Sequence, residues 1–214
     1  MHNRKRSLQL WLSALSVLSI SAVIIFLFAG TGFQKGTLVR PVEAGDHSKG
    51  NLTSAVTVVV YSDFQCPTCA DFNLAMQRIE AEYGNRVRFV HRHFPLPQHP
   101  YSPLAAFACE AAGKQGKYFE MRDRLYATAG EWSGSKRPNE YYEKLALELK
   151  LDITRFRADS ESKETMDHVV EDFHSAVTSG ANQTPSVFVN SRLIDGTVTE
   201  QELRRKIDEA INAR

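Results

Sequence analysis

The sequence of 214 residues predicts an α/β domain with an inserted helical subdomain, preceded by one N-terminal transmembrane helix. Three observations support this fold class. An uncharged apolar run over residues 7–30 follows a cluster of basic residues. A run rich in β-branched residues over 55–61 leads into a segment with helical periodicity, which is typical of a strand followed by a helix. Residues from about 102 to 179 then show only helical patterns, before strand-like runs return.

The N-terminal region predicts export of the rest of the chain. Arg4, Lys5 and Arg6 precede the apolar run, and positive charge there places the N-terminus in the cytoplasm. The run suits a spanning helix of about 17–25 residues better than a signal-peptide core of about 7–15. We therefore expect residues 1–30 to form a cytoplasmic tip and a transmembrane signal-anchor, although Gly-Thr-Gly at 30–32 also fits signal-peptide cleavage. Either way the rest lies on the periplasmic or cell-surface side, where thiol–disulfide chemistry is possible.

Composition bounds the remainder of the chain. Residues 31–53 contain several glycines and few large apolar residues, so we expect a linker there and a folded domain over 54–214. The 26 Lys and Arg nearly balance the 25 Asp and Glu, which argues against nucleic acid or an acidic polymer as a partner. Three cysteines form a closely spaced pair and one remainder, too few for a disulfide-stapled scaffold.

The folded domain is expected to open with a strand–helix–strand unit. The run 55–61 indicates a strand buried on both faces. The helix after it is indicated by four apolar residues that share one face: Phe72, Met76, Ile79 and Tyr83. Residues 86–94 give the next strand, which prolines 95 and 97 end. A crossover of this length implies parallel strands with a right-handed connection.

Helices then predominate until the chain returns to the sheet. Four helices are expected in the insertion, near residues 104–112, 118–126, 142–149 and 166–177. Strand character returns at 186–190, and the short turn at 190–191 predicts an antiparallel hairpin with residues 192–196. Thr199 and Glu202 fit a capping box that starts a final helix.

The pair Cys66-Pro67-Thr68-Cys69 falls at the turn between the first strand and its helix. Pro67 lies near the first helical position, where a missing N–H costs nothing. A helix N-terminus stabilises anions, so a thiol there can have a pKa well below about 8.5. Cys66 would face solvent and act as the nucleophile, while Cys69 lies one turn further in. Half of a zinc site is the alternative, but no second Cys-x-x-Cys and no His-x-x-x-His accompanies the pair.

Three segments carry a family resemblance: residues 61–69 (YSDFQCPTC), 92–100 (RHFPLPQHP) and 181–190 (ANQTPSVFVN). In order and spacing, with the helical insertion between them, they resemble the DsbA-like thiol:disulfide oxidoreductases of bacterial envelopes, in particular the membrane-tethered members. The resemblance covers about residues 54–213. It implies a thioredoxin-like fold with an inserted helical subdomain.

The resemblance also implies roles for matched residues. Cys66 would exchange with a substrate disulfide or thiolate, and Cys69 would resolve the mixed disulfide. Pro185 would be a cis proline facing the pair, although an ordinary trans proline opening a strand is the alternative. The backbone of Thr184 would pair with an extended substrate segment. The surroundings of the pair would include Phe64, Pro67 and Thr68. No cofactor is expected beyond the redox-active Cys66–Cys69 disulfide.

Two positions depart from the family pattern. Many relatives carry an acidic residue six positions before the first cysteine, which serves proton transfer to the inner thiol, but this chain has Val60 there. Proton transfer would then run through water, or Asp63 or another group would substitute. Strongly oxidising relatives hold a histidine where this chain has Thr68, so we expect a less extreme reduction potential, within about −270 to −120 mV.

Other reactive residue types are expected to be structural. Cys109 lies on an apolar helix face, which favours a buried inert thiol over a regulatory or intermolecular disulfide. His91 and His93 would share a strand face, but His99 lies past two prolines, and no carboxylate accompanies them at a metal-binding spacing. We therefore expect no metal.

The sequence thus predicts an enzyme that exchanges disulfides with exported proteins as an oxidant. A reductase or isomerase supplied with electrons across the membrane is the alternative within that class. A thioredoxin-fold module that binds clients without turnover is the alternative from another class. The expected partners are thiols and disulfides of exported proteins, a membrane or soluble redox partner, and the membrane itself through the N-terminal helix.

Overall fold

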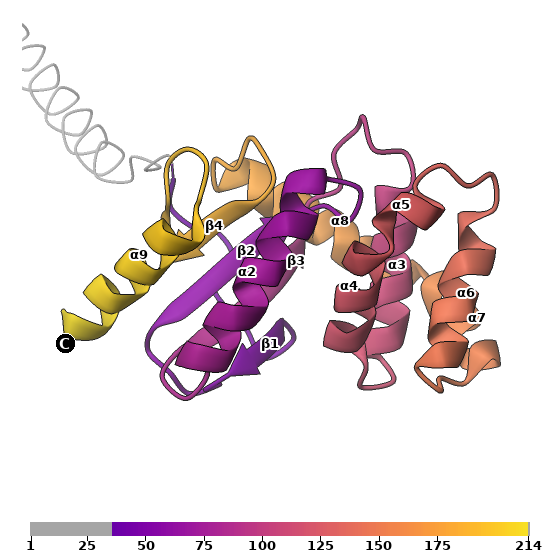
Figure 1. Cartoon of the computed structure of the whole chain (residues 1–214), viewed down its shortest axis with the longest axis horizontal. Coiled ribbons are helices and arrows are strands. Elements are labelled where there is room, and N and C mark those ends of the chain that lie inside the picture. The colour runs from indigo at the N-terminus through magenta and orange to yellow at the C-terminus, as the bar shows by residue number, and fades with distance from the viewer. Residues whose placement is uncertain (1–35, 214) are drawn as a thin grey trace, which may run out of the picture. The chain divides into compact units, whose positions relative to one another are not determined.

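A five-stranded mixed sheet lies at the centre of residues 36–213, which are the residues that the computed structural model describes (Figure 1). The strand order is β1-β3-β2-β4-β5, and the bounds are β1 His47–Gly50, β2 Thr57–Ser62, β3 Arg88–His93, β4 Ser186–Val189 and β5 Arg192–Leu193. Strands β2 and β3 are parallel, as the crossover length predicts, whereas β4 runs antiparallel to β2.

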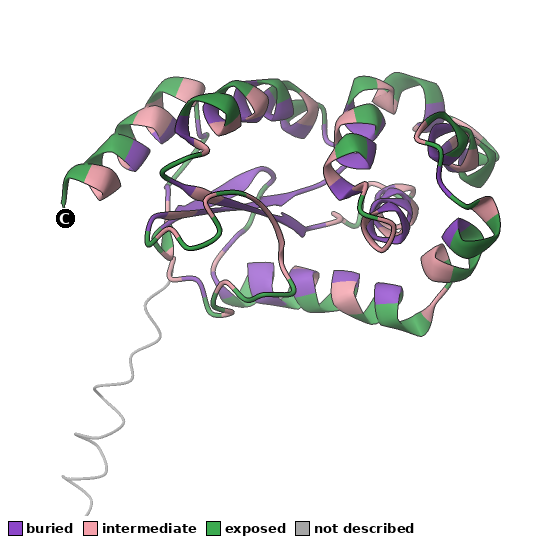
Figure 2. Ribbon diagram, turned by 90° about the horizontal axis from the view of Figure 1, so that it is seen from below, coloured by how far each residue is buried: buried purple, intermediate pink, exposed green. Residues whose placement is uncertain are grey.

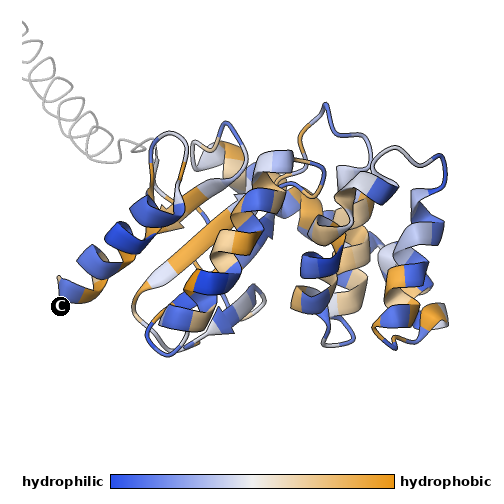
Figure 3. Cartoon of the chain, in the orientation of Figure 1, coloured by the Kyte–Doolittle hydropathy of each residue, from blue (hydrophilic) through white to orange (hydrophobic). Residues whose placement is uncertain are grey.

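Helices cover both faces of the sheet (Figure 2), and their bounds are α2 Pro67–Tyr83 and α9 Glu200–Asn212 on one face and α8 Lys163–Thr178 on the other. Alternate residues of β2 therefore enter different apolar clusters. Val58 and Val60 pack with α2 and α9, whereas Val59 and Tyr61 pack with residues of α8. This arrangement confirms the predicted burial of the strand on both faces. Figure 3 shows apolar residues along the central strands and a largely hydrophilic outer side on α9.

The C-terminal hairpin and helix form as the sequence predicts. Asn190 and Ser191 both have positive φ, 45° and 66°, which suits a two-residue turn between twisted strands. Strands β4 and β5 pair antiparallel on either side of that turn. The Thr199 hydroxyl accepts a hydrogen bond from the Glu202 N–H at 3.2 Å and caps α9.

The helical insertion contains more helices than the four predicted. Its members are α3 Ser102–Gly113, α4 Tyr118–Ala127, α5 Ala129–Trp132, α6 Pro138–Glu148, α7 Ile153–Ser160 and α8. Helix α7 escapes prediction because it buries a single residue, Phe156, which leaves no apolar periodicity to detect. Its start is marked by Asp152, whose side chain accepts a hydrogen bond from the Arg155 N–H. Helix α8 leaves the insertion to cover the sheet.

The predicted linker over residues 31–53 is wrong from Gly36 onward, because this segment is part of the folded domain. Near its start, the Leu38 N–H donates to the Ser191 carbonyl and the Leu193 N–H donates to the Gly36 carbonyl, each at 2.8 Å. Further on, β1 pairs antiparallel with β3. The segment therefore lies along both edges of the sheet.

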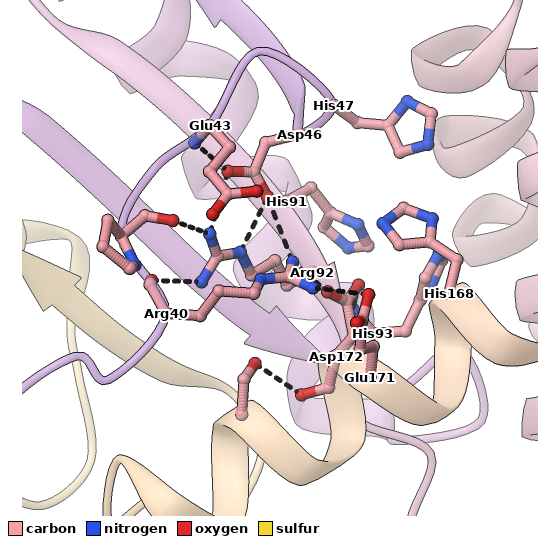
Figure 4. Close-up of polar contacts among 12 residues, drawn as sticks. Arg40, Glu43, Asp46, His47, His91, Arg92, His93, His168, Glu171 and Asp172 are labelled. Atoms are coloured by element: carbon pink, nitrogen blue, oxygen red, sulfur yellow. Dashed lines mark hydrogen bonds and ion pairs between the residues drawn. The ribbon is translucent and has the colours of Figure 1, made fainter.

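Buried charge explains why a segment poor in apolar residues is held in place. Arg92 of β3 is fully buried and needs partners for its guanidinium. Asp46 accepts two hydrogen bonds from it at 2.8 Å, and the carbonyls of Arg40 and Pro41 accept two more (Figure 4). Arg40 also pairs with Asp172 of α8. Composition alone suggests a linker, but these polar contacts fix the segment.

The membrane prediction falls outside the described part of the chain. The expected transmembrane helix over residues 7–30 lies among residues that the structure does not describe. Among residues 36–213, every helix is too short or too polar to cross a bilayer.

Candidate active site

The Cys-x-x-Cys pair occupies the turn between β2 and α2. Strand β2 ends at Ser62, and Cys66 is the N-cap residue of α2 with extended backbone angles. Pro67 takes the first helical position, as predicted. The Cys69 N–H donates to the Cys66 carbonyl at 3.0 Å, which closes the first turn. Pro67 and Thr68 are exposed, so they form the outer rim of the site.

The Cys66 thiol has a strongly lowered pKa. It falls to about 5, and the largest cause is a hydrogen bond that the Cys69 thiol donates to the Cys66 sulfur. This effect outweighs burial, which raises the pKa. The nearby side chains of Thr184 and Thr68 and the Cys69 N–H lower the pKa further. The expectation that Cys66 faces solvent is wrong in degree, since the residue is only 8% exposed.

Cys69 has the opposite ionisation behaviour. Burial raises its pKa well above the ordinary value, and its hydrogen bond to Cys66 raises it further. Both residues are free thiols in the structure. The dithiol therefore holds one thiolate on Cys66 and one proton on Cys69 at neutral pH. This division of roles is the one that the order of the two cysteines predicts.

The loop before β4 places Thr184 and Pro185 against the pair. The Thr184–Pro185 peptide bond is cis, which confirms the isomer implied by the resemblance. The Thr184 carbonyl oxygen lies 3.5 Å from the Cys66 sulfur. The Thr184 hydroxyl is buried without a hydrogen-bond partner among the described residues, and the Thr184 side chain beside the pair lowers the pKa of both thiols. The sequence assigned only the backbone of Thr184 to the site, so its hydroxyl is an additional functional group.

A groove opens beside Pro185. Its walls come from the start of α2 and from the two loops that flank the β4–β5 hairpin. The residues on its surface include Thr68, Phe72, Gln183, Thr184, Pro185 and Val198. An extended peptide segment can therefore approach the rim of the Cys pair from this side.

Phe64 and Asp63 shape the turn that leads into Cys66. Phe64 is buried beneath the pair, with its ring 4.8 Å from that of Tyr126. The buried Asp63 carboxylate accepts hydrogen bonds from the Leu96 N–H at 2.7 Å and from His99 Nδ1 at 2.9 Å. Asp63 therefore anchors the loop after β3 and does not present its carboxylate to Cys69.

A small internal cavity lies on the inner side of Cys69. Ser62, His91 and Tyr126 line it, and it has room for a water molecule. The Ser62 hydroxyl lies 2.7 Å from the Tyr126 hydroxyl and 2.8 Å from His91 Nε2. Val60 also lines this cavity, so the position that is acidic in many relatives contributes only an apolar wall. The one sign of this polar group in the sequence is Ser62, a serine at the end of an otherwise apolar strand.

The remaining cysteine and histidines take separate places. Cys109 is fully buried, as expected, and burial raises the pKa of its thiol well above the ordinary range. His91 and His93 lie side by side on β3 with ring centroids 5.6 Å apart, whereas His99 bonds to Asp63. The three histidines therefore do not converge.

Comparison with known proteins agrees with this geometry. The family model described as Thioredoxin matches residues 43–209. A thioredoxin-like oxidoreductase from Silicibacter pomeroyi DSS-3 superposes with a TM-score of 0.70 and 30% identity, covering 80% of this chain and 95% of that one. Oxidised BdbD from Bacillus subtilis gives a TM-score of 0.72 at 20% identity, covering 83% and 99%. Wolbachia pipientis alpha-DsbA1 gives 0.72 at 20% identity, covering 82% and 95%.

Sequence relatives include much longer proteins. The Na(+)/H(+) antiporter NhaA 1 of Salinispora arenicola (strain CNS-205) is 37% identical over 175 residues, which cover 81% of this chain and 26% of the antiporter. NhaA of Herminiimonas arsenicoxydans is 37% identical over 152 residues, 71% of this chain and 23% of that protein. The chain thus spans about a quarter of the length of these relatives. Taken with the family match and the shared architecture, these findings show that the chain belongs to the thioredoxin family and has the fold of the DsbA-like thiol:disulfide oxidoreductases.

Proposed function

We propose that this protein is a thiol:disulfide oxidoreductase that donates its Cys66–Cys69 disulfide to exported proteins. The observation that carries the proposal is the lowered pKa of Cys66, about 5, beside a Cys69 thiol whose pKa is raised. A stabilised thiolate favours the reduced form of the pair, which makes the disulfide form a better oxidant. The ionisation of Cys66 therefore supports the oxidising direction of exchange.

The exchange proceeds in two balanced steps. A substrate thiolate attacks the Cys66 sulfur of the disulfide, which forms a mixed disulfide and releases Cys69 as a thiolate that takes up a proton. A second substrate thiolate then attacks the substrate sulfur of the mixed disulfide and releases Cys66 as a thiolate. Cys66 leaves readily because its pKa is low. The substrate loses two electrons, and the Cys pair gains them.

The groove beside Pro185 is the proposed place for the client segment. An extended chain there would pair with the backbone of Thr184, in the manner of strand addition. This placement brings a client sulfur toward Cys66, whose sulfur lies 3.5 Å from the Thr184 carbonyl.

Proton delivery to Cys69 is assigned to the cavity on its inner side. A water molecule held there can hydrogen-bond the leaving Cys69 thiolate and the hydroxyls of Ser62 and Tyr126. The Ser62 and Tyr126 hydroxyls and His91 form a connected polar group, so a proton can be replaced after each transfer. This route takes the place of the acidic residue that Val60 replaces.

The N-terminal sequence supports a location on the outer side of the cytoplasmic membrane. The basic residues and apolar run over 1–30 favour a single-pass anchor with the catalytic domain outside. Relatives that contain a matching segment carry the names of Na(+)/H(+) antiporters, which is consistent with a domain that works at a membrane. A membrane or soluble redox partner would reoxidise the pair.

Equilibration of the full-length protein with glutathione tests the direction of exchange. A reduction potential more positive than about −200 mV is expected of an oxidant, whereas a value near −270 mV would favour the reductase alternative. Cys66→Ser tests the non-catalytic alternative, because the variant should lose dithiol oxidation and insulin reduction. Full activity in that variant would contradict the proposal.

A further inference from the structure

A buried carboxylate on α3 gathers three histidines that lie far apart in the sequence. Glu110 is almost fully buried on an otherwise apolar helix face. Its carboxylate lies 2.9 Å from Nε2 of His47, 3.0 Å from Nδ1 of His168 and 2.7 Å from Nε2 of His93. These histidines come from β1, α8 and β3 respectively. Four separate elements therefore place their polar atoms at one point.

The geometry of three of these residues suits a metal ion. Nε2 of His47 and Nδ1 of His168 each lie 3.0 Å from the same oxygen, Oε2 of Glu110. The three ligand atoms all lie within 4.8 Å of one another. In a tetrahedral zinc site with bonds of about 2.0–2.1 Å, ligand atoms are about 3.3 Å apart. Small side-chain movements would therefore bring the three ligand atoms to the separations that a bound zinc ion requires.

Surrounding residues hold these ligands in orientation. His93 is buried and contacts Oε1 of Glu110 at 2.7 Å, and His47 lies between the two oxygens, 2.9 Å from Oε1 and 3.0 Å from Oε2, so the carboxylate is held toward His47 and His168. The His47 ring stacks on Tyr118, with centroids 3.5 Å apart and an interplanar angle of 8°. Outer contacts of this kind preorganise metal ligands.

The site is open to solvent on one side. The side chains of His47 and His168 are 20% and 27% exposed, and Figure 4 shows both beside the ion pairs that fix the N-terminal segment. The hollow next to His168 is lined by five acidic side chains, which are Glu43, Asp46, Glu164, Asp167 and Glu171, and by two basic side chains, Arg40 and Lys163, so acidic groups are in excess. A negative rim attracts cations and raises their local concentration.

We propose that Nε2 of His47, Oε2 of Glu110 and Nδ1 of His168 bind one Zn²⁺ ion, with water in the fourth position. Two imidazoles and one carboxylate suit a borderline cation such as Zn²⁺, whereas Ca²⁺ and Mg²⁺ prefer oxygen ligands. The ion would join β1 to the helical insertion and so act as a clamp on the N-terminal segment. This role is independent of the dithiol chemistry.

Calorimetric titration of the full-length chain with Zn²⁺ tests the proposal. Cys66→Ser/Cys69→Ser protein is the starting form, because thiolates of the pair would otherwise compete for the metal. One ion per chain is expected. At a free Zn²⁺ concentration 100 times the Kd, the folding equilibrium should shift ~100-fold toward the folded state.

His168→Ala should weaken Zn²⁺ binding at least ~10-fold and remove most of that stabilisation, since one of three protein ligands is lost. His174→Ala is the matched control, because His174 lies exposed on the same helix and outside the cluster. His47→Gln provides a second ligand deletion, should His168→Ala fold poorly. A parallel titration with Ca²⁺ tests the donor chemistry.

The outcomes separate cleanly. Stoichiometric Zn²⁺ binding that His168→Ala and His47→Gln weaken and His174→Ala preserves supports the site. Equal affinity in His168→Ala and His174→Ala overturns it, as does tighter binding of Ca²⁺ than of Zn²⁺. If the Cys66→Ser/Cys69→Ser protein does not bind Zn²⁺, the proposal is wrong and the cluster consists of hydrogen-bonded ion pairs only. None of these results depends on the redox activity.

Discussion

The start of α2 and the middle of α3 both bury cysteines in the same apolar cluster, yet the two regions have opposite chemistry. Cys66 and Cys109 are 8% and 0% exposed. The pKa of Cys66 is lowered to about 5, whereas burial raises that of Cys109 well above the ordinary range. Burial alone therefore does not determine whether a thiol is reactive in this protein.

Hydrogen-bond donors explain the difference. The Cys69 thiol, the Thr184 and Thr68 side chains and the Cys69 N–H all lower the pKa of Cys66. Cys109 lies inside its helix, where its thiol donates to the Tyr118 carbonyl at 3.4 Å and burial is the largest cause of its raised pKa. Both thiols lie beside a carbonyl oxygen, so the difference comes from the Cys69 thiol and the other groups that stabilise the Cys66 thiolate, whereas burial dominates at Cys109.

Replacing the nucleophile should have the largest effect. Cys66→Ser is expected to reduce dithiol oxidation by at least ~1000-fold, because no other thiolate is available at the groove. The measurement is the rate of disulfide formation in a reduced model peptide, with Cys109→Ser as the matched control. If both variants lost activity equally, the contrast between the two regions would be wrong.

Tyr126→Phe should slow the step that releases Cys69, by about 10-fold or more, because the cavity water loses one hydroxyl partner. Stopped-flow measurement of mixed-disulfide formation with a small thiol reports this step. Tyr142→Phe removes a hydroxyl from another buried tyrosine of the same cluster and should leave the rate unchanged. A change in the pKa of Cys66 in Tyr126→Phe would point to a structural effect instead.

Thr184→Val removes the hydroxyl group beside Cys66 without changing the size of the side chain. We expect the pKa of Cys66 to rise by about one unit and the reduction potential to become more negative by about 30 mV. Thiolate absorbance against pH and glutathione equilibration measure the two quantities. Thr197→Val, at an exposed position on the same groove, is the control. An unchanged pKa in Thr184→Val would remove its hydroxyl from the site.

The pH dependence of the free energy of unfolding should distinguish the two regions. The pKa of Cys66 is lower in the folded protein, so its thiolate stabilises the reduced protein fully above the unfolded pKa of about 8.5, and this contribution is lost as pH falls through about 5. The free energy of unfolding of the reduced protein, measured with denaturant, should therefore exceed that of Cys66→Ser. The difference should grow as the pH rises from about 5 to about 8.5. Cys109→Ser should show no such growth, since the folded state keeps Cys109 protonated. A pH-independent margin for Cys66→Ser would contradict the lowered pKa.

Cys109→Ala should have the smallest effect on catalysis. Activity is expected to stay within about twofold, while the small cavity left behind costs about 1–2 kcal/mol of unfolding free energy. Paired activity assays and urea unfolding measure both. A large loss of activity without a loss of stability would favour the alternative that Cys109 forms a regulatory disulfide.

Local patterns predicted the parts of this molecule that depend on neighbouring residues. The β-branched run of β2, the proline at the start of α2 and the two-residue turn of the hairpin each specify their structure within a few positions. The cis bond before Pro185 followed from family resemblance, because the dipeptide itself does not determine the isomer.

Contacts between distant residues escaped prediction. Glu110 meets His47 and His168, which lie 63 and 58 positions away, so no local spacing reveals the cluster. A single charge on the apolar face of α3 was the available sign. Strand β1 was missed for a related reason, since its segment is held by Arg92, a residue 46 positions beyond Asp46.

The segment over residues 36–50 has a consequence for how the sheet meets other polypeptide chains. Unpaired sheet edges invite pairing with other chains and so favour aggregation. Here Gly36 and Leu38 occupy the backbone groups beside β5, and the short strand that carries Lys49 shields β3. Removing residues before 54 would expose both flanks at once and invite self-association. The same few residues thus protect the domain against association through its own sheet edges.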